Sequence, residues 1–369
     1  MGKRKTSSSS TSSSRNNNRK KKKIISTNNY KDAFLIRTYN PSTTAIQRIL
    51  KWCIEIKNYN NNNNNNQQMD FWISIDCTLP RLNTILNAKS KVDNHGRKRI
   101  ECGVNHADTI ANITVKEQII DTVNTNVDFK NDIKIGTDIY FHEYTESDLI
   151  SLYPKLNEIN SDKAYSNSRI KKRNRCSLAW GMHCEAINYW YRDEIINKSN
   201  SNSSSSNHDL DLYYKNIWVF EDDVGYSGNI CNLLSYYKKN EEYVNADVIT
   251  SNLTNVKKRW CWRDTCSENY NINYPMKIRY QTQEHCQRFS SKFLNHLHMI
   301  GIEKGCHAWS ESFVPTACLA DGFILKFFEK SHIGPTYAWN GRVEAKEWEK
   351  IINSYSNRPR DKLYHALKY

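Results

Sequence analysis

Four consecutive apolar residues, Ile217-Trp218-Val219-Phe220, lead directly into three carboxylates, Glu221-Asp222-Asp223. An unbroken apolar run of this length is typical of a strand that is buried on both faces, as in sheets covered by helices on each side. Adjacent carboxylates are costly to bury, so the strand is expected to end where they begin. Ligands of open α/β sheets bind at this edge. The segment therefore predicts an α/β fold and locates a candidate site.

The rest of the chain alternates between strand-like and helix-like patterns. Short apolar runs predict strands, and apolar residues at three- and four-residue steps predict helices. Their order predicts an open, mostly parallel sheet with helices on both faces. The predicted strands cover residues 33–36, 71–76, 138–142, 217–220 and 246–250, and the predicted helices cover residues 43–57, 177–194 and 319–330.

Low-complexity segments divide the chain unevenly. Residues 1–29 form a basic tail rich in Ser, Asn and Lys, which is too polar to fold and is predicted to be disordered. Asn- and Ser-rich inserts at 60–68 and 197–207 are expected to lengthen surface loops without dividing the domain. The folded part is then one domain with two halves, 30–255 and 256–369.

Charge and composition restrict the class of protein. The net charge is +14, but nine basic residues and no acidic residue lie within the first 23, and the remainder carries only +5. The basic run at 19–23 predicts contact with an anionic surface or an import receptor, or a solvated tail without a partner. No apolar stretch approaches the roughly 18 residues of a membrane span, and no secretory signal is visible. These observations favour a cytoplasmic or nuclear protein; a misassigned N-terminus would reopen the secretory pathway.

The three carboxylates are candidate metal ligands. Alternation along the strand puts Glu221 and Asp223 on one side and Asp222 on the other. Two carboxylate oxygens on one face, with water and phosphate oxygens beside them, suit Mg²⁺ or Mn²⁺. The alternative is a solvated acidic loop.

At this point the chain resembles glycosyltransferases of the GT-A fold, which end a strand with an Asp-x-Asp or Glu-Asp-Asp motif. The lipopolysaccharide and collagen glycosyltransferase families show a similar order of helix, loop and apolar strand before Glu221-Asp222-Asp223. The resemblance covers roughly residues 30–255. It implies a Rossmann-like half that binds a nucleotide-sugar, an acceptor-side half over 256–369, and transfer of the sugar to a hydroxyl of a glycan or protein.

The resemblance also implies roles for individual residues. Arg37, Thr38 and Tyr39 after the first strand, with Asp76 after the second, would bind the nucleotide base and ribose. Asp223, together with Glu221 or Asp222, would hold a divalent ion against the donor diphosphate. An inverting enzyme would in addition need a carboxylate base.

The C-terminal half offers further candidates, each with a structural alternative. Asp321 is the first choice for the base but is equally suited to cap the helix predicted at 319–330, and Glu311 is the second choice. His332 is a candidate third metal ligand or a plain loop histidine. Trp262 would stack on the donor or anchor a loop. His183 is expected to be a buried, hydrogen-bonded support.

Two other functions remain open. Basic clusters at 171–175 and 257–259, with the tail, suit a nucleic-acid-associated protein, including a Mg²⁺-dependent phosphodiesterase. A GT-A-like domain that binds without catalysing is the other alternative. Zinc binding by Cys261, Cys266, His285 and Cys286 is disfavoured by their irregular spacing.

Overall fold

The computed structural model describes residues 31–63, 68–78, 114–161, 178–193, 214–260, 262–338, 341–353 and 361–367. The basic tail, the basic cluster at 171–175 and the insert at 197–207 lie outside the described residues. Residues 64–67 of the insert at 60–68 also lie outside them.

A seven-stranded sheet forms the centre of the molecule, in the order β10-β6-β9-β4-β1-β2-β3. Strands β4, β1, β2 and β3 are parallel neighbours, β6 is parallel to β10, and only β9 runs antiparallel to its neighbours β4 and β6. The predicted α/β class with an open, mostly parallel sheet is therefore confirmed. The strand bounds are β1 Lys31–Thr38, β2 Met69–Asp76, β3 Tyr140–Tyr144, β4 Tyr214–Glu221, β6 Val248–Thr250, β9 Cys286–Ser290 and β10 Leu325–Phe327.

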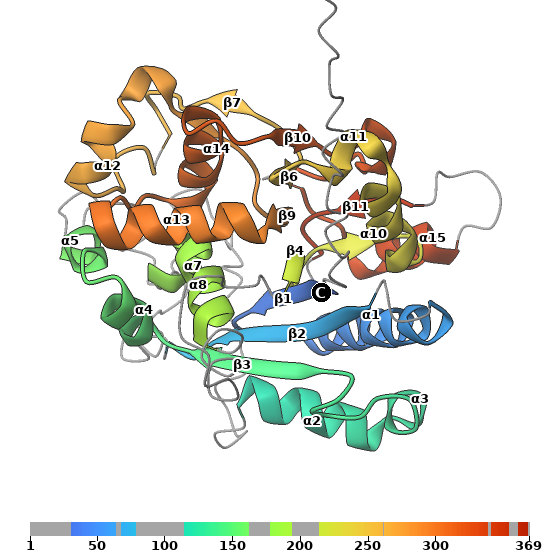
Figure 1. The fold of residues 1–369 in the computed structure, drawn as a ribbon. Coiled ribbons are helices and arrows are strands. Elements are labelled where there is room, and N and C mark those ends of the chain that lie inside the picture. The colour runs from blue at the N-terminus through green and yellow to red at the C-terminus, as the bar shows by residue number, and fades with distance from the viewer. Residues whose placement is uncertain are drawn as a thin grey trace, which may run out of the picture.

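Helices cover both faces of this sheet (Figure 1). In β4, Trp218 and Phe220 belong to the hydrophobic cluster under α1 and α10, whereas Ile217 and Val219 belong to the cluster under α8 and α13. This split explains the unbroken apolar run, because successive side chains of a strand point to opposite faces and both faces are buried. The helix bounds are α1 Thr43–Asn62, α2 Val115–Thr125, α3 Val127–Lys130, α4 Glu146–Leu152, α5 Leu156–Ser161, α7 Leu178–Gly181, α8 His183–Trp190, α10 Ile230–Lys239, α11 Glu241–Val244, α12 Glu268–Asn273, α13 Ser291–Lys304, α14 Ser310–Ala320 and α15 Ala345–Asn353.

Two predicted helices differ from the structure. The helix expected at 319–330 is wrong: α14 ends at Ala320, and the following residues enter the sheet edge as β10. Gly322, at φ +80°, reverses the chain there, and the Phe323 amide donates to the Cys318 carbonyl in a helix-terminating turn. The helix expected at 177–194 is broken into α7 and α8 at Met182, whose backbone is not helical.

Two short antiparallel pairs complete the fold. Strands β7 Thr254–Asn255 and β8 Tyr280–Gln281 form one, and β5 Gly225–Tyr226 and β11 Leu363–Tyr364 form the other. The second pair attaches the C-terminal segment to the residues that directly follow the carboxylate turn. Within the described residues, no helix has the length and apolar character needed to cross a bilayer.

Candidate active site

A pocket of about 380 Å³ opens at the carboxyl ends of β1, β2, β3 and β4. Parallel neighbours bring these four ends to one edge of the sheet, which is where open α/β sheets bind ligands. Most of the residues predicted for the site meet here. The lining includes Arg37, Thr38, Tyr39, Asp76, Glu221, Asp222, Asp223 and Glu311 from the sequence prediction, and Tyr144, His183, Glu284, His285 and His365 in addition.

The carboxylate turn is held from both sides. Asp222 accepts a hydrogen bond of 2.5 Å from the Thr38 hydroxyl, and its backbone carbonyl accepts one from the Arg48 guanidinium. The Asp223 carbonyl accepts a hydrogen bond of 2.8 Å from the Leu367 amide. The side chain of Asp222 is thereby fixed against β1, whereas the side chains of Glu221 and Asp223 both reach His365, as their alternation predicts.

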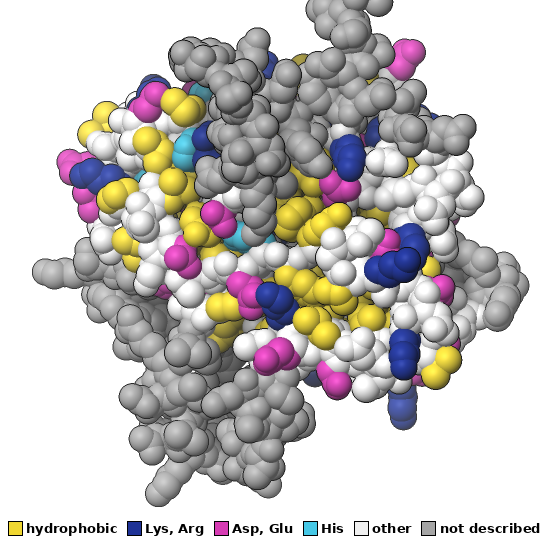
Figure 2. Space-filling view, turned by 60° about the horizontal axis from the view of Figure 1, so that its bottom comes forward, with side chains coloured by type: hydrophobic (Ala, Val, Ile, Leu, Met, Phe, Trp, Pro, Cys, Tyr) yellow, Lys and Arg dark blue, Asp and Glu magenta, His cyan; other side chains and the backbone are white. Residues whose placement is uncertain are grey.

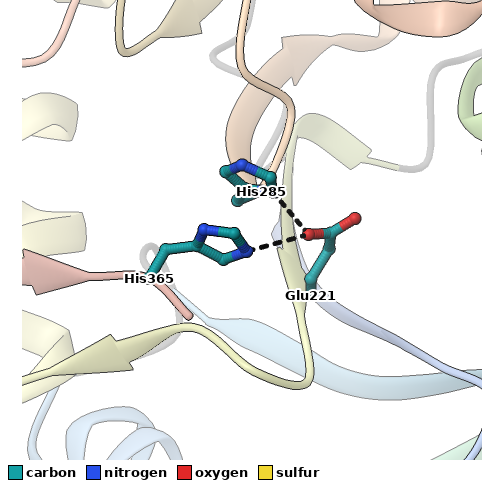
Figure 3. A group of neighbouring side chains, drawn as sticks. All are labelled: Glu221, His285 and His365. Carbon is teal, nitrogen blue, oxygen red and sulfur yellow. Dashed lines mark hydrogen bonds and ion pairs between the residues drawn. The ribbon is translucent and has the colours of Figure 1, made fainter. Parts of the chain in front are cut away.

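Three histidines surround Glu221, and two of them are drawn in Figure 3. His285 Nδ1 lies 2.6 Å from Glu221 Oε2, and His365 Nε2 lies 3.9 Å from the same oxygen and 3.4 Å from Asp223 Oδ1. The two imidazole rings stack with centroids 3.4 Å apart. His183 Nε2 lies 3.6 Å from Glu221 Oε1. Glu221 is therefore the centre of the cluster.

This environment changes the pKa values of neighbouring groups in opposite directions. Burial alone would raise the pKa of Glu221, but the imidazoles of His285, His183 and His365 outweigh it and hold that pKa well below its usual range. Burial, with the charge of Asp223, raises the pKa of Asp222 to about 6. Burial lowers the pKa of His365, but its carboxylate partners Asp223 and Glu221 outweigh that effect and raise it.

The cluster fits a divalent transition metal. The ligand atoms of Glu221, His285 and His365 all lie within 4.8 Å of one another. Carboxylate oxygens suit Mg²⁺ and Mn²⁺, whereas imidazole nitrogens suit transition metals, so the mixed set favours Mn²⁺ over Mg²⁺. Asp223, next to His365, can supply a further oxygen.

Other walls of the pocket carry the groups that the sequence assigned to the nucleotide. Arg37 is buried and its guanidinium donates to the Tyr144 hydroxyl at 3.5 Å. Asp76 accepts from the Thr78 amide, which fixes its carboxylate at the end of β2. Tyr39 also lines the pocket and is 38% exposed. Thr38 lines the pocket as well, and its hydroxyl donates to Asp222.

Two buried carboxyls, Glu284 and Glu311, complete the pocket. Glu284 Oε1 lies 3.5 Å from His183 Nε2. Burial, together with the charges of Glu311 and Glu221, raises the pKa of Glu284 well above its usual value. Of the two base candidates named from the sequence, Glu311 is the one that lines the pocket.

Three predicted site residues lie elsewhere. Asp321 follows α14 and accepts hydrogen bonds from the Tyr274 hydroxyl and His296, each at 2.7 Å, so it is neither in the pocket nor at a helix N-terminus. His332 lies 2.8 Å from the Tyr237 hydroxyl. Trp262 is buried and stacks on Trp309 with centroids 3.5 Å apart.

Two histidines of the cluster were not assigned to the carboxylates from the sequence. His285 comes from the residues just before β9 and His365 from the C-terminal segment, and neither lies in a local pattern that marks it. His183 was expected to be a buried support, and it is buried beside Glu221 and Glu284. Of the zinc alternative, Cys261 lies outside the described residues, and the thiols of Cys266 and Cys286 pack in separate hydrophobic clusters.

No known family model matches the chain, and no curated protein matches it. Among solved structures, the galactosyltransferase LgtC in complex with donor and acceptor sugar analogs aligns over 90% of this chain and 86% of its own, at 7% identity and a TM-score of 0.34. The mannosyltransferase Ktr4p from S. cerevisiae in complex with GDP aligns over 80% of this chain and 67% of its own, at 10% identity and a TM-score of 0.34. This likeness alone assigns no activity.

The face shown in Figure 2 offers little support for nucleic-acid binding. Lys257, Lys258 and Arg259 lie in the loop after β7 and do not line the pocket. On the face shown in Figure 2, basic side chains are scattered among acidic ones. A single-sign basic surface, the usual footprint of a nucleic-acid interface, is not seen on that face among the described residues.

Proposed function

We propose that the protein is a metal-dependent glycosyltransferase that moves a sugar from a nucleotide-sugar to an acceptor hydroxyl. One observation carries the proposal: one pocket at the strand ends joins Arg37 and Asp76, suited to a nucleoside, to the Glu221–His285–His365 cluster and Asp223, suited to a metal diphosphate. When bound, the metal ion would neutralise the negative charge that develops on the leaving diphosphate.

The side chains of the chain itself would bind and orient the reactants. Arg37 and Tyr39 would contact the nucleotide, and the bond between Thr38 and Asp222 would keep the carboxylate turn in place. The acceptor oxygen would form a bond to the anomeric carbon as the bond from that carbon to the phosphate oxygen breaks. For an inverting reaction, Glu311 is the carboxylate that we assign to take the acceptor proton.

Binding of Mn²⁺ and nucleoside diphosphates tests the site. We expect wild-type protein to bind UDP or GDP far more tightly with Mn²⁺ than without it, and Asp223→Asn to lose this metal dependence. Equal nucleotide affinity with and without Mn²⁺, or no binding at all, would contradict the proposal. Metal-dependent binding without turnover of any donor would favour the inactive binding domain.

The choice of base is tested by paired variants. Glu311→Gln is expected to lower kcat by roughly 10²–10⁴ while leaving Mn²⁺ affinity unchanged, since general-base catalysis contributes about that much. Asp321→Asn is expected to leave kcat unchanged and to cost about 1 kcal/mol of stability through its contacts with Tyr274 and His296. A folded Asp321→Asn variant without turnover would reverse the assignment.

A further inference from the structure

Two buried carboxyls, Glu284 and Glu311, form the part of the pocket beside the metal cluster. Both line the pocket, with exposed fractions of only 5% and 4%. The Thr282 amide donates to the Glu311 backbone carbonyl at 2.9 Å, which joins the segment before β9 to the first turn of α14. Each carboxyl therefore lies within the electrostatic field of the other.

One oxygen of Glu284 lacks a hydrogen bond within the part of the chain that the structure describes. Glu284 Oε1 lies 3.5 Å from His183 Nε2, whereas Oε2 is buried without a partner. Proteins keep few buried polar atoms in this state, because each one costs free energy. In the wall of a pocket, such an atom indicates a bond that a ligand supplies. A hydroxyl group can supply it whether Glu284 is ionised or protonated, because a hydroxyl both donates and accepts.

The pocket carries an excess of negative charge. Six carboxyls line it, and Arg37 is the one lysine or arginine among the described residues of its lining. A divalent ion at Glu221 and Asp223 would offset two of the six, and a donor diphosphate brings further negative charge. Glu284 and Glu311 do not both become neutral, because the charge on one is what favours protonation of the other. An additional anionic group in this pocket therefore meets repulsion in a poorly solvated setting.

We propose that the sugar of the donor is uncharged, and that Glu284 and Glu311 select it over the corresponding acidic sugar. The inference rests on the proposed function, which brings the anomeric carbon within reach of Glu311 and so the sugar beside Glu284. Hydroxyl groups of a neutral hexose would bond to Glu284, whereas the carboxylate of a uronic acid would be repelled by the pair. The class of donor is then a nucleoside-diphosphate hexose.

Calorimetric binding of matched donors to the full chain, in the presence of Mn²⁺, tests the proposal. The pairs are UDP-glucose with UDP-glucuronate, UDP-galactose with UDP-galacturonate, and GDP-mannose with GDP-mannuronate. The two members of a pair differ at C6, which is a hydroxymethyl group in the neutral sugar and a carboxylate in the acidic one. UDP and GDP alone give the affinity of the nucleotide without a sugar.

A double variant tests the role of the two carboxyls. Glu284→Gln/Glu311→Gln removes the charge of the pair, whichever carboxyl carries it, and keeps the size of both side chains. Asp321→Asn is the matched control, because it replaces a carboxylate that bonds to Tyr274 and His296 outside the pocket. Thermal unfolding shows whether each variant is folded, and the wild-type pairs decide the proposal even if the double variant is not.

We expect at least one neutral donor to bind wild type at least about tenfold more tightly than its acidic partner, because like charges brought together in a site are costly. The double variant should narrow this ratio at least about fivefold, since the repelling charge is gone, and Asp321→Asn should leave it unchanged.

Acidic donors that bind as tightly as their neutral partners, or an unchanged ratio in a folded double variant, would overturn the inference. Mn²⁺-dependent binding of UDP or GDP in the same experiment would then still support the proposed function. Absence of Mn²⁺-dependent binding for every nucleotide would contradict both, so the two failures are distinguished.

Discussion

At the scale of single residues, adjacent carboxylates of one turn have pKa values shifted in opposite directions because their surroundings differ. Glu221 faces three imidazoles and remains ionised, whereas Asp222 faces a threonine hydroxyl beside another carboxylate, which raises its pKa to about 6. Strand alternation separates Asp222 from Glu221 and Asp223, but the sequence does not show which groups face each of them. Only the fold, which brings histidines from distant segments to one side of the turn, makes them different.

A buried histidine outside the pocket predicts a pH dependence of stability. Burial, with a smaller contribution from Arg192, lowers the pKa of His298 to about 3, and its Nδ1 lies 2.8 Å from the Tyr153 hydroxyl. The unfolded chain, with a pKa near 6.5, binds this proton more readily, so stability falls as the pH drops from about 6.5 towards 3. Between pH 7 and pH 5, this histidine costs wild type about 2 kcal/mol.

His298→Gln removes the titrating group while keeping a polar side chain of similar size. Urea unfolding of both proteins at pH 7 and pH 5 measures the difference. We expect the variant to lose less stability than wild type over this interval by about 2 kcal/mol. Identical pH dependence would contradict the lowered pKa, because it would mean that His298 titrates alike in the folded and unfolded chains.

The sequence could assign to the pocket the residues that lie at the ends of predicted strands. Arg37, Asp76 and Glu221 reach one pocket because β1, β2 and β4 are parallel neighbours in the sheet. Asp321 and Trp262 were chosen for their chemistry without such a placement, and their partners in the fold are Tyr274 and Trp309 instead. Side-chain chemistry alone does not specify position.

At the scale of elements, the C-terminal segment completes the site. Strand β11 pairs with β5, directly after the carboxylate turn, and so carries His365 to Glu221 and Asp223. A two-residue strand has no recognisable sequence pattern. His332, predicted as a third metal ligand, comes from the same half of the chain but bonds to the Tyr237 hydroxyl and does not line the pocket.

Removal of this segment is expected to disable the metal site. A chain lacking residues 363–369 should bind Mn²⁺ at least about tenfold more weakly and unfold at a lower temperature, because buried Leu363 is lost together with His365. His365→Ala in the full chain separates the two effects: it should lose metal affinity with a smaller loss of stability. Isothermal titration and thermal unfolding measure both, and a truncated chain with wild-type Mn²⁺ affinity would refute this role.

Element prediction succeeded where both local pattern and burial agreed. The strands at β1, β2 and β4 follow their apolar runs, and α1 follows its helical stripe and continues into the Asn-rich insert. It failed at 319–330, where Gly322 ends α14 and the chain turns into β10. The apolar spacing at 319–330 fits a helix. The chain instead turns at Gly322 and joins the edge of the sheet as β10.

At the scale of the whole molecule, one sheet unites the two halves of the chain. Strand β9 from the second half lies between β4 and β6 from the first, and both halves supply walls of the pocket. The sequence predicted the layers and the site edge, because both follow from burial on two faces. It could not predict the antiparallel insertion of β9, which depends on long-range pairing.

The most direct test of the central claim is the release of nucleoside diphosphate from a panel of nucleotide-sugars. Wild type and Asp223→Asn are compared with and without Mn²⁺, and a thermal-shift panel with the same donors measures binding. We expect wild type to release the diphosphate from at least one donor only when Mn²⁺ is present, and Asp223→Asn to be slower by about 100-fold or more. Absence of both release and donor binding in wild type would contradict the assignment of this pocket to glycosyl transfer.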